Sequence, residues 1–296
     1  APAARLRLRR LTAVPRRLTW LDVFTAEPLL GNQLAVVHDA DGLSEDAMGR
    51  FAAETNLSET TFVQVPEAAG ADYRNRIWMP HRELPFAGHP SLGTAVAVAL
   101  ARGEAEATYV QQTQPGLQAI DVRLDGARGH ASMLQDPASF GPELDAGRVL
   151  EAMGLAGADA DPDVPCQVVS TGFAHVMAPI ADPAALGRVR PDPARMAALL
   201  DEAGQGVVYL AARAGAGEVR ARGFFLQDGL PREDPGTGSA AGPLMAHLHA
   251  RVGWERMRVV QGVEMRRTCV IDCAVEGEHV RVGGDVAVVF ESRVAL

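Results

Sequence analysis

The sequence is poor in cysteine, and the few thiols it has follow no recognisable pattern. Its 296 residues include three cysteines, Cys166, Cys269 and Cys273. An odd number at irregular spacing is not a disulfide framework, and Cys-x3-Cys alone is a poor zinc signature. We therefore expect reduced, buried thiols in a cytoplasmic protein, and no bound metal.

Long apolar runs and an excess of positive charge are also missing. No run approaches the roughly 20 apolar residues that span a bilayer, so no membrane segment is predicted. The formal net charge of −9 argues against a general nucleic-acid binder and against attraction to anionic membranes. A small anionic substrate remains compatible with this charge, because a local helix terminus can override the global field.

Two nucleotide-binding signatures are absent as well. No Gly-x-Gly-x-x-Gly follows a predicted strand with a suitable acidic residue beyond it, and no lysine follows the glycine-rich stretches as in a Walker loop. The composition, 47% hydrophobic and 22% charged, is ordinary for a globular protein. The length suffices for two domains of ordinary size or one large domain.

Residues 1–17 are unusual because they are basic and contain no acidic residue. The stretch lacks the apolar core of a signal peptide. We expect a flexible basic extension, and an arm that binds nucleic acid is the alternative. Its arginines are Arg5, Arg7, Arg9, Arg10, Arg16 and Arg17.

Short β-rich runs dominate the rest of the chain, and few helices are long. Many strands with few long helices are typical of an α+β protein and not of a parallel doubly wound sheet. Residues 136–142 are turn-rich and predict a linker. Strands are predicted at 18–24, 34–37, 60–65, 73–79, 108–112, 117–124, 131–134, 168–172, 175–179, 207–210, 219–224, 257–261, 268–275, 280–282 and 286–290. Helices are predicted at 45–54, 91–102, 146–153, 193–203 and over the apolar run 243–249.

The stretch from Arg232 to Gly242 begins with charged residues, becomes glycine-rich and runs into the last predicted helix. Three glycines and no bulky side chain between Pro235 and Pro243 indicate that the backbone comes close to something. Free N–H groups and the helix dipole at such a helix N-terminus favour an anion. The alternative is a loop that is glycine-rich only for packing.

A second stretch, 83–94, follows the same plan of an acidic residue, a proline, glycines and a small-residue helix. Gly88-His89 stands in it where Gly238-Ser239 stands in the later stretch. The two stretches lie about half the chain apart, which predicts a pseudo-duplicated protein with two helix N-termini. If both point into one cleft, an anionic ligand can be held from two sides.

Glu59 stands between a predicted helix and the strand 60–65, among small polar residues. Two interpretations are open: a solvated loop glutamate, or a carboxylate held at the edge of a cleft for proton transfer. Hydrophobic periodicity does not distinguish them.

Several motifs together resemble the PhzF-like isomerases of phenazine biosynthesis. They occur in the family's order, and the resemblance covers roughly residues 18–292. The matching motifs are Asp22-Val23-Phe24-Thr25 with Gly31-Asn32, Asn56-Leu57-Ser58-Glu59-Thr60, Glu83-Leu84-Pro85-Phe86-Ala87-Gly88-His89-Pro90, Glu233-Asp234-Pro235 with Thr237-Gly238-Ser239-Ala240, and Gln261-Gly262 with Glu264-Met265 and Arg267.

The resemblance implies a fold like that of diaminopimelate epimerase. Two similar α+β domains would each curl a mostly antiparallel sheet around a central helix, with the active site between them. We expect an N-terminal domain at 18–135 and a C-terminal domain at 136–285, with strands near 286–296 returning to the first. The resemblance also implies a homodimer without metal or organic cofactor.

The implied activity moves a proton, and with it a double bond, in a small unsaturated cyclic carboxylic acid. The family's best-known substrate is trans-2,3-dihydro-3-hydroxyanthranilate, and some members are placed in antibiotic pathways. By resemblance Glu59 is the general acid and base, a role that suits a carboxyl group whose pKa is raised in a dry cleft.

The resemblance assigns roles to eight further residues. His89, Asp234 and Ser239 would position substrate and proton, and ordinary capping of the helices is the alternative for each. The other five would bind substrate, the first three of them as backbone donors near its carboxylate: Gly88, Thr237, Gly238, Asn32 and Gly172.

Two other functions compete with the isomerase. One is an amino-acid epimerase or racemase with two bases, but the two loops carry His89 and Ser239 where thiols would be expected. The other is a non-catalytic protein of the same fold that binds carboxylates.

Overall fold

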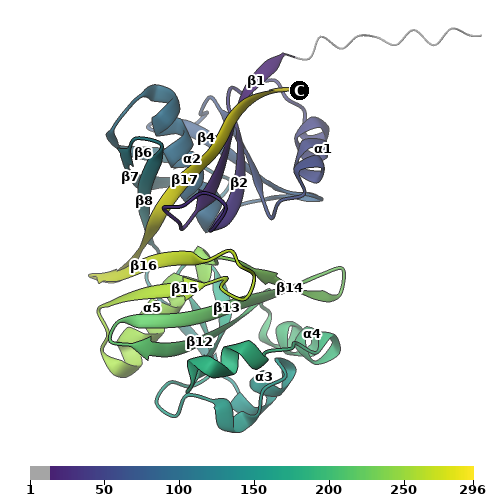
Figure 1. Ribbon diagram of the computed structural model, residues 1–296, viewed down its shortest axis with the longest axis vertical. Coiled ribbons are helices and arrows are strands. Elements are labelled where there is room, and N and C mark those ends of the chain that lie inside the picture. The colour runs from purple at the N-terminus through teal and green to yellow at the C-terminus, as the bar shows by residue number, and fades with distance from the viewer. Residues whose placement is uncertain (1–13) are drawn as a thin grey trace, which may run out of the picture.

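The computed structural model describes residues 14–296, which form two halves of similar topology stacked along the long axis (Figure 1). The predicted basic extension therefore lies mostly outside the described residues. The prediction was wrong for residues 15–17, which are not part of a flexible extension, because β1 (Pro15–Val23) begins three residues earlier than predicted. Arg16 and Arg17 lie in this strand, opposite Val294 and Arg293 of β17 (His279–Ala295).

Eight strands of the N-terminal half close a ring around the helix α2 (Gly88–Arg102). The helix is apolar on all sides, as a helix enclosed by a sheet must be, and its residues from Gly88 to Ala99 are all buried. In ring order the strands are β1, β2 (Asn32–Val37), β3 (Thr60–Gln64), β4 (Tyr73–Met79), β6 (Glu106–Gln112), β7 (Leu117–Asp125), β8 (Arg128–Gln135) and β17. Outside the ring lie β5 (Arg82–Leu84) and α1 (Glu45–Thr55).

The C-terminal half repeats this plan around α5 (Gly238–Val252). From β1 to β7 and from β10 to β16, neighbouring strands pair in one order: antiparallel, parallel, antiparallel, parallel, antiparallel. Its strands are β9 (Ser139–Glu143), β10 (Gln167–Ser170), β11 (Ala174–Ile180), β12 (Val207–Gly215), β13 (Glu218–Gln227), β14 (Leu230–Asp234), β15 (Arg256–Gln261) and β16 (Cys269–Glu276). Its outer helices are α3 (Ala146–Ala152), α4 (Pro193–Ala203) and the 3-10 helices η1 (Gly157–Asp159) and η2 (Pro183–Arg188).

The long strand β17 joins the halves. It pairs with β16 near its start, with β8 in its middle and with β1 along its second part, and Figure 1 shows it running from the lower half to the top beside β1. The sequence predicted two strands here, because Gly283 and Gly284 look like a break. These glycines instead admit close neighbours: a Cβ atom on Gly283 would lie 2.7 Å from the carbonyl oxygen of Ala131.

The α+β class and the curling of each sheet around a central helix are confirmed, and several local predictions are corrected. The helices α2 and α5 begin at Gly88 and Gly238, earlier than the apolar runs indicated. The predicted linker 136–142 contains most of β9, which pairs with β10. The short hairpin strands β5 and β14 were not predicted. The domain boundaries stay a prediction.

Polar contacts and glycines fix the local geometry of the helices. Ser44 caps α1, accepting from the backbone N–H of Ala47 at 3.2 Å. In α5, a Cβ atom on Gly242 would lie 1.8 Å from Oε1 of Gln135. Gln135 in turn donates to the carbonyl of Gly238 at 3.0 Å.

No helix within residues 14–296 is long and apolar enough to cross a membrane.

We predict that Gly242→Ala lowers the free energy of unfolding by about 1–3 kcal/mol, measured by denaturant titration. The added methyl group displaces the buried Gln135 amide and breaks its hydrogen bonds, which outweighs the gain in helix propensity of up to about 1 kcal/mol. Gly206→Ala is the matched control: among the described residues no atom lies within 4 Å of its Cβ position, so we expect a change within about 0.5 kcal/mol. Equal stability of the two variants would contradict the close packing.

Candidate active site

The N-termini of α2 and α5 meet where the two halves touch. A Cβ atom on Gly88 would lie 3.4 Å from the backbone nitrogen of Ser239, within van der Waals contact of the opposite helix. The first N–H groups of a helix have no partner within it, and the positive ends of both dipoles point to this place. The two glycine loops predicted from the sequence are therefore brought together.

Glu59 reaches this junction from the turn that follows α1. The helix ends on Asn56, whose left-handed φ of 50° turns the chain, and β3 begins directly after Glu59. The side chain is 14% exposed, and its Oε2 lies 3.5 Å from Nε2 of His89, which is 7% exposed. Within the described residues, neither of these two atoms has a hydrogen-bond partner. The solvated-loop interpretation of Glu59 does not fit this burial.

Glu59 and His89 are both neutral near pH 7, although their separation is that of an ion pair. Burial, with a smaller contribution from the charge of Asp234, raises the pKa of Glu59 to about 8. Burial lowers the pKa of His89 to about 3. A protonated carboxyl group thus faces a neutral imidazole, and both side chains are largely shielded from solvent.

Asp234 differs from Glu59 because donors surround it. Thr237 donates its hydroxyl to Oδ2 at 2.7 Å, and the Asn32 amide donates to Oδ1 at 2.9 Å. Burial raises the pKa of Asp234, while these bonds oppose the rise because they stabilise the carboxylate. Of the two buried carboxyl groups, Asp234 is the better stabilised anion and Glu59 the readier proton carrier.

Asn32 and Gln261 hold the Asp234 loop against its surroundings. The Asn32 amide also donates to the carbonyl of Gly236 at 3.0 Å and lies 3.3 Å from Nδ1 of His89. Gln261 donates to the carbonyl of Asp234 at 2.8 Å and accepts from the backbone N–H of Thr237 at 3.1 Å. This last bond uses the backbone N–H of Thr237, and a contact of Thr237 with the substrate carboxylate stays a prediction.

The turn that carries Asn32 is itself fixed by a buried ion pair. Asp22, 1% exposed, pairs with Arg267 and accepts from the backbone N–H of Leu29 at 2.6 Å. Arg267 also donates to the carbonyl of Gly31 at 3.0 Å. Residues from both ends of the chain therefore position one site amide.

Ser239 has a partner that the sequence did not indicate. Its Oγ lies 3.2 Å from Nε2 of His175, a buried residue of β11. Burial lowers the pKa of His175 to about 4, so the ring is neutral. A histidine in an otherwise apolar strand, three residues after Gly172, was the available signal for this contact.

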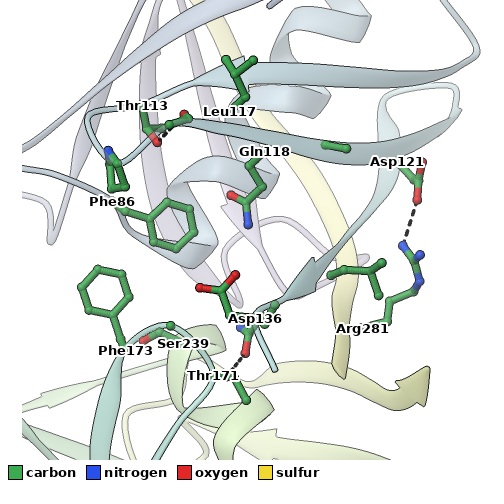
Figure 2. A pocket seen from close by; sticks show the side chains of 16 residues that line it. Phe86, Thr113, Leu117, Gln118, Asp121, Asp136, Thr171, Phe173, Ser239 and Arg281 are labelled. Carbon is green, nitrogen blue, oxygen red and sulfur yellow. Dashed lines mark hydrogen bonds and ion pairs between the residues drawn. The ribbon is translucent and has the colours of Figure 1, made fainter. Parts of the chain in front are cut away.

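A cavity of about 540 Å³ opens beside Ser239, between the halves (Figure 2). Phe86, which precedes α2, and Phe173, in the β10–β11 turn, stack across it with ring centroids 5.7 Å apart. Gln118 and Asp136 point into it. Of the predicted site residues, Ser239 and Gly172 line the cavity, whereas Glu59, His89 and Asp234 do not.

The described residues offer no ready-made metal site, since no group of three or more His, Cys, Asp or Glu side chains within 14–296 is placed to hold an ion. The three cysteines are buried, and burial raises the pKa of Cys166 to about 12. None of these thiols lies in the two loops.

The chain belongs to the phenazine biosynthesis-like (PhzC/PhzF) family, whose model matches residues 21–292. It is similar to the trans-2,3-dihydro-3-hydroxyanthranilate isomerase of Pseudomonas aeruginosa, with 36% identity over 289 residues, 95% of this chain and 99% of that protein. The isomerase of the same name from Pseudomonas fluorescens is 37% identical over 262 residues, 87% of this chain and 89% of the relative. The chain is accordingly an isomerase of this family.

Solved structures agree with the fold. A predicted epimerase from Pseudomonas aeruginosa superposes with a TM-score of 0.83 at 34% identity, over 95% of this chain and 99% of the other. A PhzF-family protein from Bacillus anthracis gives 0.83 at 25% identity, over 96% and 100%. A hydroxyproline epimerase from Agrobacterium vitis, at 15% identity and a TM-score of 0.61 over 95% and 91%, shares the fold.

The raised pKa of Glu59 predicts how stability depends on pH. Its value is 4.5 in the unfolded chain and about 8 in the fold, so between these values the folded state binds more protons. Stability is then lost as pH rises from about 4.5 to 8, by up to about 1.4 kcal/mol per unit from this group. Glu59→Gln removes the loss, so the variant should gain on the wild type across this window in denaturant titrations.

Glu54→Gln, at an exposed position of α1, is the control and should follow the wild-type curve. Parallel curves for Glu59→Gln and wild type would show that Glu59 ionises as freely in the fold as in the unfolded chain.

Proposed function

We propose that this isomerase moves a proton, and with it a double bond, in a small unsaturated cyclic carboxylic acid, without a cofactor, and that Glu59 is the general acid and base. The observation that carries the proposal is the environment of Glu59. It is a buried carboxyl group with a pKa of about 8, set against a neutral histidine. Such a group exists in both protonation states near neutral pH, so it can take a proton from one carbon and give it to another.

The two carboxyl groups have different environments and therefore different roles. Thr237 and Asn32 donate to Asp234 and stabilise its ionised form, and the charge of that form raises the pKa of Glu59. Nδ1 of His89 faces the amide nitrogen of Asn32, so the neutral ring carries its proton on Nε2 and can donate it to the ionised form of Glu59. Asn32 serves this arrangement by orienting Asp234, and does not need to touch the substrate.

The substrate carboxylate would lie where the two helix N-termini meet. Backbone N–H groups of Gly88, Gly238 and Ser239 and both helix dipoles favour an anion at this point. The cavity beside Ser239 provides the approach, and Gly172 forms part of its wall. To reach Glu59, the reacting carbons must extend past Ser239 into the junction.

The substrate class follows from the relatives and from the cavity. The two isomerases at 36% and 37% identity are named for trans-2,3-dihydro-3-hydroxyanthranilate, a cyclic unsaturated amino acid. The stacked Phe86 and Phe173 give the cavity flat apolar faces, which suit a planar ring. We propose a substrate of this class, used in secondary metabolism such as antibiotic biosynthesis.

We predict that Glu59→Gln abolishes turnover and the incorporation of deuterium from solvent into the product. Removing a general acid and base costs about 10²–10⁴-fold or more. Asp234→Asn should be less damaging than Glu59→Gln, because an amide can still fill the loop. The measurement uses trans-2,3-dihydro-3-hydroxyanthranilate and related cyclic unsaturated acids in deuterated water, followed by NMR, with Glu54→Gln as the matched control.

The outcomes of this experiment separate the functions. Unchanged exchange in Glu59→Gln would remove Glu59 from the mechanism, and a larger loss in Asp234→Asn would mean that the roles are exchanged. Carboxylate binding without exchange by the wild type would favour the non-catalytic protein. Loss of optical rotation of an amino acid would favour the epimerase, against which the burial of Cys166, Cys269 and Cys273 argues.

The proposal includes a cytoplasmic homodimer. We predict a mass of about twice the 31.3 kDa of one chain by light scattering after size-exclusion chromatography, at a concentration above that of the activity assay. A mass of a single chain that persists under these conditions, with full activity, would contradict the dimer.

A further inference from the structure

His175 is the partner of Ser239 in the wall of the cavity, and neither the family's motifs nor the proposed proton transfer gives it a role. It lies in β11, is 6% exposed, and its Nε2 is 3.2 Å from the Ser239 hydroxyl oxygen. Ser239 is the second residue of α5 and faces the cavity (Figure 2). Ser239 thus faces the cavity from the half opposite to Glu59, and His175 lies behind it.

The direction of the hydrogen bond follows from the other ring nitrogen. Within residues 14–296, Nδ1 of His175 is buried and has no hydrogen-bond partner. A proton on Nδ1 would leave a buried N–H group unpaired, which is rare in folded proteins and costly. A proton on Nε2 leaves only a lone pair without a partner, and Nε2–H then donates to Ser239.

This direction determines what Ser239 offers to a ligand. Its oxygen accepts from His175, so its own hydrogen turns away from the ring and toward the cavity. A hydroxyl group held in this way is a donor, and a donor beside two helix N-termini suits a carboxylate. In the part of the chain that the structure describes, no acidic side chain is hydrogen-bonded to the second nitrogen of His175, so the pair lacks the third group that orients and charges the histidine of a nucleophilic triad.

We propose that His175 is a positioning residue that holds Ser239 as a hydrogen-bond donor to the substrate's carboxylate. The inference rests on the proposed function only in placing a carboxylate beside Ser239, where the two helix N-termini meet. The burial that keeps the ring neutral supports it, since a neutral ring has a single N–H to direct. Ser239 then contributes to binding, and proton transfer remains with Glu59.

The test measures binding, which does not depend on turnover. Calorimetry with 2-aminobenzoate, a stable planar amino acid, should show that its Kd rises roughly tenfold or more in Ser239→Ala and about threefold to tenfold in His175→Leu. In Ser239→Ala/His175→Leu the Kd should match that of Ser239→Ala within about twofold, because His175 acts through Ser239. Aniline, which lacks the carboxylate, should bind all variants alike.

Two further variants separate positioning from packing. His175→Gln places an amide N–H near the position of Nε2, so its Kd should return to within about twofold of the wild type. His247→Leu is the matched control, since His247 is a buried histidine on α5 that does not line the cavity, and its Kd should not change. Melting temperatures of all variants report on folding.

Three results would each overturn the proposal. They are a wild-type Kd in His175→Leu, a Kd in the double variant that is raised by the product of the two single effects, and no binding of 2-aminobenzoate to the wild type. With substrate, the expected change is in KM with kcat within about twofold, and a tenfold fall in kcat at constant KM would make the pair a proton relay instead. This pattern of Kd values can be observed even if the protein shows no isomerase turnover, and turnover can be observed without the pattern. The failure of the proposed function and the failure of this inference are therefore distinguishable.

Discussion

The meeting of two helix N-termini is the constraint on which the rest of the structure depends. The ends of α2 and α5 bring two positive dipole ends and their free N–H groups together, and the backbone at Gly88 lies close to the backbone nitrogen of Ser239. Each helix must be buried on all sides to hold its end there. The ring of strands around α2 and its repetition around α5 provide that burial.

The electrostatics of the site follow from this packing. Burial by itself would neutralise every carboxyl group present. Asp234 resists because Thr237 and Asn32 donate to it, whereas Oε2 of Glu59 has no donor among the described residues. Two acidic side chains in one junction therefore have different tendencies to ionise, which is the usual way in which a site separates a proton carrier from a fixed charge.

The site side chains are held in place by residues from distant parts of the sequence. Asp22 in β1 and Arg267 before β16 fix the turn that places Asn32, and Gln261 fixes the first residues before α5. His175 orients the hydroxyl of Ser239 from a third element. Each helix terminus is thus held by side chains remote from it in the sequence, as a site needs if its geometry is to persist when a ligand enters.

The sequence by itself determined the α+β class, the duplication and the two glycine loops, because these depend on local patterns: apolar runs, prolines and glycines at fixed spacing. It also pointed to Glu59 through a motif. It did not predict that β17 is one strand, since Gly283 and Gly284 look like a break until the neighbouring backbone of β8 is present. Only the tertiary structure decided that the Glu59 side chain is largely shielded from solvent, that the backbone N–H of Thr237 is hydrogen-bonded, and that His175 contacts Ser239. Burial, pKa and the direction of a hydrogen bond depend on neighbours that the chain brings together only when it folds.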